Sequence, residues 1–97
     1  MKIPPRITRR INQDFPQEER ATILQLLEEV IESAGRGIPI LEERVAAAIL
    51  LHSRGNFERF AQATDLAQHD WRDLLMAVDG MAHEGWEQHI DREFGAP

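Results

Sequence analysis

The run Val-Ala-Ala-Ala-Ile-Leu-Leu at residues 45–51 contains no polar side chain, and it decides the fold. A helix on a protein surface carries one apolar stripe and one polar face, whereas a helix that is apolar almost all round is contacted from several sides. The helix is expected to begin at Pro39, because proline suits a first turn, and to run to about Ser53. Gly55 follows as a stop signal. The sequence therefore predicts a central helix covered by others.

An amphipathic helix is predicted before this central helix. It is expected to begin at Asp14, because Asp14 and Gln17 have the spacing of a capping box, and to end at Gly35. Apolar side chains recur between them at steps of three and four residues, which places them on one face. These side chains are Ile23, Leu26, Leu27, Val30, Ile31 and Ala34. The polar face holds glutamates, for which a solvated surface is expected. They are Glu28, Glu29 and Glu32.

Further helices are predicted after the central one. Asn56 and Asp70 are each expected to cap a helix, and a last short helix is expected over residues 86–94, where apolar side chains are four residues apart. No segment alternates with period two, so no sheet is predicted. The fold class is all-α: a compact bundle of four to five short helices with an extended N-terminal arm. The predicted core residues are Leu27, Ile31, Val45, Ile49, Phe60, Trp71, Leu75 and Trp86.

Charge is divided unevenly along the chain. Residues 1–13 hold four basic residues and no acid, while residues 14–97 hold 7 basic against 17 acidic residues, a net charge of −10. The basic residues of the first segment are Lys2, Arg6, Arg9 and Arg10. Because Pro4-Pro5 disfavours a helix, residues 1–13 are predicted to form an extended basic arm beside a single helical domain at residues 14–97. The acidic domain is expected to repel phosphate backbones and attract basic partners.

Composition narrows the classes of function. The chain has no cysteine, which excludes disulfides and thiolate metal sites and suits a reducing cytoplasm. No apolar run approaches the roughly 20 residues needed to cross a bilayer, and residues 1–13 lack the apolar stretch of a signal peptide. The protein is therefore expected to lie in the cytoplasm, without a membrane contact.

No part of the sequence matches a strong catalytic, cofactor-binding or metal-binding motif. Ser33 and Ser53 lie outside any Gly-x-Ser-x-Gly nucleophile elbow, and no His-x-x-x-His pair offers two metal ligands. His69 has Asp65 and Asp73 at four-residue spacing, which is common between exposed side chains of one helix. We therefore predict no catalytic, cofactor or metal residues. A small enzyme that uses His69 and nearby carboxylates stays open as an alternative.

A resemblance covers residues 45–80. The segments Ala48-Ile49-Leu50-Leu51, Gly55-Asn56 and Asp70-Trp71-Arg72-Asp73-Leu74-Leu75 resemble a pattern of small helical bacterial proteins that have no assigned activity. The resemblance implies a bacterial source and a helical fold, and it brings no site residues and no cofactor. Within the last segment Asp70 is expected to cap a helix and Trp71 to enter the core, which leaves Arg72 outside and unexplained by packing.

These observations together favour a non-catalytic protein-interaction module. In the simplest form the protein associates with itself, and the basic arm of one subunit crosses the acidic surface of another. The predicted contact residues are Arg6, Arg9, Arg10 and Arg72. Two further alternatives stay open: the protein neutralises a basic protein partner, or the arm contacts nucleic acid, which the acidic helices themselves would repel.

Overall fold

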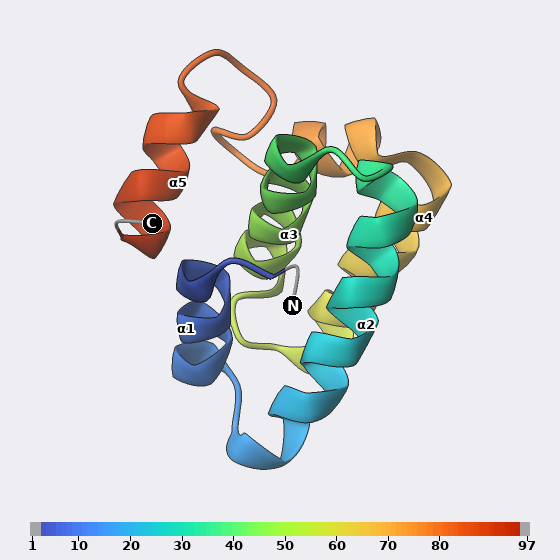
Figure 1. The fold of residues 1–97 in the computed structure, drawn as a ribbon, viewed down its shortest axis with the longest axis vertical. Coiled ribbons are helices and arrows are strands. Elements are labelled where there is room, and N and C mark those ends of the chain that lie inside the picture. Colours follow the sequence, from blue (N-terminus) through green and yellow to red (C-terminus); the bar gives the residue numbers. More distant parts are fainter. Residues whose placement is uncertain (1–2, 96–97) are drawn as a thin grey trace.

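The computed structural model describes residues 3–95, in which five helices and no strand occur (Figure 1). The helices are α1 (Pro5–Asp14), α2 (Gln17–Gly35), α3 (Pro39–Ser53), α4 (Phe57–Ala77) and α5 (Trp86–Phe94). The molecule measures 35 × 29 × 24 Å along its principal axes. The predicted compact all-α bundle is therefore confirmed. None of the helices in the described part of the chain combines the length and apolar character needed to span a membrane.

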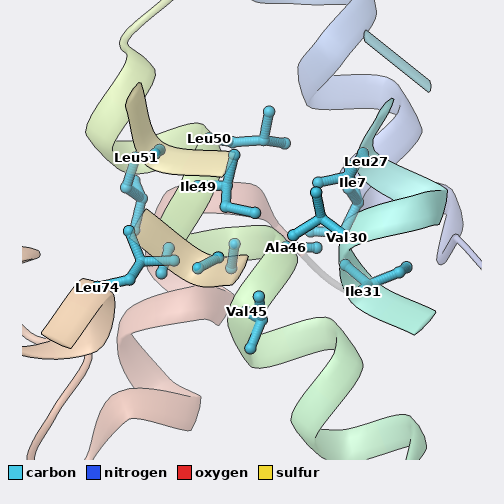
Figure 2. Close-up of a cluster of buried hydrophobic side chains, with 14 of the residues drawn as sticks. Ile7, Leu27, Val30, Ile31, Val45, Ala46, Ile49, Leu50, Leu51 and Leu74 are labelled. Carbon is cyan, nitrogen blue, oxygen red and sulfur yellow. The ribbon is translucent and has the colours of Figure 1, made fainter. Parts of the chain in front are cut away.

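α3 is the centre of the bundle. Residues 45–51 are at most 3% exposed, and α3 packs against α1, α2 and α4. Figure 2 shows Ile49 of α3 in one buried cluster with Ile7 from α1, Leu27 from α2 and Leu74 from α4. Burial of a large apolar side chain stabilises a fold by about 1.5–3 kcal/mol relative to exposure. The apolar run therefore makes α3 the element on which the others assemble.

The N-terminal segment is a helix, so the predicted extended arm is wrong. Pro5 lies in the first turn of α1. Backbone N–H groups of a first turn have no intrahelical acceptor, so a proline there loses no helical hydrogen bond. Ile3, Ile7 and Ile11 are buried, the last two completely, because four-residue spacing places side chains on one face of a helix. α1 packs against α2 and α3 and shares their core. Residues 5–14 thus cover the core rather than stand apart from it.

α2 begins at Gln17, and the predicted cap at Asp14 is wrong. Asp14 is the last residue of α1, and its carboxylate accepts a hydrogen bond from Arg10 Nε at 2.8 Å. Pro16 precedes α2 in an extended conformation, and Arg20 donates to two backbone carbonyls at the junction of the two helices. A short connection therefore joins α1 to α2 at the place where the sequence predicted that the first helix of the chain would begin.

α4 bends at Asp70, where the sequence predicted two separate helices. Asp70 has φ −159° and ψ 102°, and its side chain accepts a hydrogen bond from the backbone N–H of Arg72 at 3.0 Å. Asn56 caps the start of α4 by accepting from the backbone N–H of Arg59 at 3.0 Å. Both predicted caps are confirmed. The two predicted helices form one bent element because only Asp70 separates them.

The two tryptophans lie at the edge of the core rather than inside it. The other six predicted core residues are buried, while Trp71 and Trp86 are half-buried. Trp86 lies beneath Arg44, whose guanidinium carbon is 4.6 Å from the ring centroid and whose nitrogens donate to the carbonyl of Met81 at 2.7 and 3.0 Å. Burial lowers the pKa of Arg44 from its ordinary value. Arg44 therefore holds the α4–α5 connection against α3.

Candidate functional site

Arg6, one of the predicted partner contacts, lies inside the protein. Its guanidinium donates to both carboxylate oxygens of Glu43 on α3, at 2.9 and 3.0 Å, and to Asp91 Oδ1 on α5 at 2.6 Å. A third acceptor is the carbonyl of Gly95 at 3.1 Å. The Arg6 side chain is 7% exposed, and the hydrogen bond to Glu43 is the largest cause that raises the pKa of Arg6. A partner cannot reach this guanidinium unless α1 moves away.

Arg9 and Arg10 hold the C-terminal end of α5. Arg9 donates to the carbonyl of residue 94 at 2.8 Å, and Arg10 donates to the carbonyl of residue 93 at 2.7 Å. Together with Arg6, they occupy three consecutive carbonyls at a helix end, where backbone acceptors lack intrahelical partners and carry partial negative charge. These three arginines therefore connect α1 to the C-terminal end of α5 within the chain.

Arg72, the fourth predicted contact residue, lies on the surface beside Trp71. Its guanidinium carbon is 5.6 Å from the ring centroid of Trp71, a distance typical of a cation–π contact. Within residues 3–95 its guanidinium makes no hydrogen bond or ion pair. The predicted placement of Arg72 outside the core is confirmed. A partner can therefore reach this cation.

A hollow of about 330 Å³, which we refer to as the bend hollow, lies between the end of α2 and the bend of α4. Its lining residues are Ser33, Ala34, Arg36, Ala67, Gln68, His69, Asp70, Trp71 and Arg72. Arg36 follows α2 with φ 52°, in the left-handed region that costs a residue with a side chain about 1–2 kcal/mol. The hollow thus brings two arginines and one carboxylate together, an arrangement that can hold an anionic group of a partner.

The turn that follows Arg36 exposes apolar side chains. Ile38 is 50% exposed and Ile40 is 55% exposed, and Met76 near the end of α4 is 76% exposed. Every other large apolar side chain in residues 3–95 is buried or half-buried. We define the turn face as Arg36, Ile38, Ile40 and Arg72: the two arginines line one hollow, and the isoleucines follow Arg36 by two and four residues in the chain. The turn face combines two apolar side chains with two cations.

The residues proposed for the alternative enzyme do not form a catalytic arrangement. His69 Nδ1 lies 2.9 Å from the backbone carbonyl of Asp65 and 3.7 Å from its carboxylate, and the two side chains are 75% and 73% exposed. Within residues 3–95, His69 makes no hydrogen bond or ion pair with Asp73 or with Ser33, although Ser33 lines the same hollow. A nucleophile needs its base within hydrogen-bond reach. The same part of the chain holds no group of three or more histidine, cysteine or acidic side chains suited to a metal ion.

No protein-family model, curated protein or solved structure matches the chain. The function must therefore be inferred from the residues that the fold brings to one surface.

Sequence reasoning found one of the four turn-face residues and missed three. Packing leaves Arg72 unexplained in the sequence, whereas Arg36 and Ile38 fall in the connection between two predicted helices and Ile40 falls in the first turn of the central one. The sequence signal for these residues is the run Ile38-Pro39-Ile40. Turns are ordinarily polar, and nothing nearby in the sequence would bury two isoleucines at this turn.

Proposed function

We propose that the protein is a non-catalytic protein-interaction module of the cytoplasm and that the turn face is its binding surface. The exposure of Ile38 and Ile40 carries this proposal, because the other large apolar side chains of residues 3–95, except Met76, are buried or half-buried. Covering such side chains contributes about 25 cal/mol for each Å² of apolar area removed from water. The absence of cysteine supports the cytoplasmic placement.

The chemistry of the turn face selects a partner that carries an apolar side chain beside a carboxylate. Arg36 and Arg72 line one hollow, and guanidinium groups pair with carboxylates through two parallel hydrogen bonds. A second copy of this chain offers such a carboxylate, because Glu29 of α2 is exposed to solvent. Self-association is therefore the form of interaction that these charges favour first.

An antiparallel pairing of two α2 helices would satisfy these charges twice. Glu29, Ser33 and Arg36 follow one another at steps of four and three residues, so they lie along one exposed side of α2. A two-fold axis near Ser33 would place Arg36 of one copy beside Glu29 of the partner subunit, and the same contact would recur across the axis. In this pairing Ile38 of each copy, two residues beyond Arg36, would lie against α2 of the partner subunit and be removed from water.

Light scattering over a concentration series tests this proposal. The mass of the wild-type protein is expected to rise from 11.1 kDa toward twice that value as the concentration increases. Ile38→Asp is expected to move association to concentrations about tenfold higher or more, because burying an unpaired carboxylate costs more than about 1.4 kcal/mol. Ala61→Asp adds the same charge at an exposed position of α4 that lines neither hollow, and it should associate as the wild type does.

A monomeric wild-type protein at every concentration would contradict self-association. Equal association of the wild-type and Ile38→Asp proteins would contradict the turn face as the surface that mediates it.

The other classes of partner draw less support. Nucleic-acid binding depended on the basic residues of segment 1–13, but Arg6, Arg9 and Arg10 hold the end of α5, and Lys2 lies outside the described residues. The acidic face of α2 suits a basic protein as well as a second copy of the chain. The two possibilities differ in the light-scattering experiment, because a chain that requires a basic partner stays monomeric alone.

A further inference from the structure

A second hollow, of about 240 Å³, is formed by the end of α3, both ends of α4 and the middle of α5. We refer to it as the α3–α5 hollow. Leu51, Ala77 and Val78 form its apolar part. Its charged and titratable side chains are His52, Arg54, Arg59, Asp79, His89 and Glu93. None of these residues belongs to the turn face, so the hollow is a separate surface feature.

The α3–α5 hollow is basic relative to the protein that contains it. The whole chain carries −6 with its histidines neutral, whereas the hollow balances two arginines against two carboxylates and adds two histidines. Its lining therefore carries no net charge with both histidines counted as neutral, whereas the chain as a whole is acidic. Arg54 Nη1 pairs with Glu93 Oε1 at 3.3 Å. Within residues 3–95, the side chains of Arg59 and His52 make no hydrogen bond or ion pair.

Arg59 occupies a position that is unfavourable for a cation. It lies in the first turn of α4, where the positive end of the helix disfavours a positive charge. Negative charge in the hollow would offset this cost directly.

His89 is fixed in the hollow by its contact with the backbone. Gly80 has φ 84°, and a Cβ atom at this residue would lie 2.9 Å from His89 Cδ2, so the chain packs directly against the imidazole ring. Arg92 Nη2 lies 3.3 Å from His89 Nδ1. The ring therefore has neighbours in both Gly80 and Arg92, and its Nδ1 accepts from the guanidinium.

We propose that the α3–α5 hollow binds a phosphate-type oxyanion through Arg54 and Arg59, with the imidazole N–H groups of His52 and His89 as further donors. The forked N–H donors of a guanidinium match the oxygen atoms of a tetrahedral oxyanion. The volume of the hollow accommodates such a group together with part of the molecule that carries it. A metal ion is not the occupant, since the described residues offer no set of three ligands.

Sulfate is the probe, because it is a tetrahedral oxyanion whose charge does not change near neutral pH. An NMR titration of the full chain at constant ionic strength is expected to shift the backbone amides of His52, Arg54 and Arg59. The same spectra report whether each variant is folded.

Arg54→Gln and Arg59→Gln are each expected to weaken sulfate binding about tenfold. Arg20→Gln is the matched control, since it removes the same charge at a residue that lines neither hollow, and it should leave binding unchanged. Equal weakening by Arg20→Gln, or no shift of the three amides, would overturn the proposal.

Inorganic phosphate and phenyl phosphate distinguish the two sources of such an anion. Tighter binding of phenyl phosphate assigns the hollow to phosphate esters whose organic part contacts Leu51 and Val78, while equal binding assigns it to the free oxyanion. Binding of neither compound at a concentration at which sulfate saturates the protein would contradict a site for phosphate.

Discussion

Replacing Arg6 by methionine tests how α1 is held in the bundle. Methionine retains much of the length and the apolar character of the arginine stem. The change removes four hydrogen bonds, two to Glu43, one to Asp91 and one to the carbonyl of Gly95. The Glu43 side chain, 21% exposed, then holds a carboxylate that has lost its cation.

The expected loss of stability follows from the burial of the two carboxylates. Removal of one member of a buried ion pair costs about 3–5 kcal/mol, whereas an exposed pair contributes about 0–1 kcal/mol. The pair of Arg6 with Glu43 is close to a buried ion pair. The pair of Arg6 with Asp91 is close to an exposed one, because the Asp91 side chain is 59% exposed. We therefore expect Arg6→Met to lower the unfolding free energy by about 2–4 kcal/mol.

Urea unfolding followed by circular dichroism measures this loss. Arg92→Met is the control, because Arg92 is exposed on α5 and a surface substitution changes stability by no more than about 0.5 kcal/mol. Arg6→Lys keeps the charge without the paired N–H donors and is expected to recover only part of the loss. A loss below about 1 kcal/mol for Arg6→Met would refute its role as the link between α1, α3 and α5.

Three further substitutions test the fold. Ile49→Ala should cost about 2–5 kcal/mol in urea unfolding because Ile49 is fully buried in α3, and a loss near zero would contradict that placement. Asp70→Ala should cost about 1 kcal/mol in thermal unfolding because it removes the cap at the bend of α4, so unchanged stability would argue against the cap. Arg36→Gly should raise the unfolding free energy by about 0.5–1 kcal/mol, since glycine relieves left-handed strain, and a lowered value would contradict the strain at this residue.

The central helix could be predicted because a helix that is buried on all sides has apolar residues all round, and a short stretch of sequence shows this composition. Residues 45–51 contain no polar side chain, and the structure buries each of them. The caps at Asn56 and Asp70 were predictable for a similar reason, since a cap joins residues that are two or three positions apart. In these places the residues that determine the structure lie within a few positions of one another in the sequence.

The last residue of α2 shows where a local rule fails. The helix ends at Gly35, as predicted, but Arg36 rather than this glycine takes the left-handed position. A Cβ atom at Gly35 would meet the side chain of Glu42, so glycine is required there for close packing of α3. The reason for this glycine thus lies in the next helix.

The N-terminal helix and both hollows depend on residues that are far apart in the sequence. Pro4-Pro5 disfavours a helix locally, yet the burial of Ile7 and Ile11 and the hydrogen bonds from α1 to α5 favour one. The bend hollow likewise brings together Arg36 and Arg72, which are far apart in the sequence. No local pattern in the sequence indicates such pairs, so the fold itself was needed to find them.

Light scattering of a charge-swap pair tests the proposed self-association most directly. Arg36→Glu alone is expected to give a monomer, because the new carboxylate would meet Glu29 of the partner subunit. The double variant Arg36→Glu with Glu29→Arg restores opposite charges at both copies of the contact, and it is expected to associate as the wild type does. A double variant that stays monomeric while the wild type associates would contradict the antiparallel α2 contact through which we propose that two chains bind.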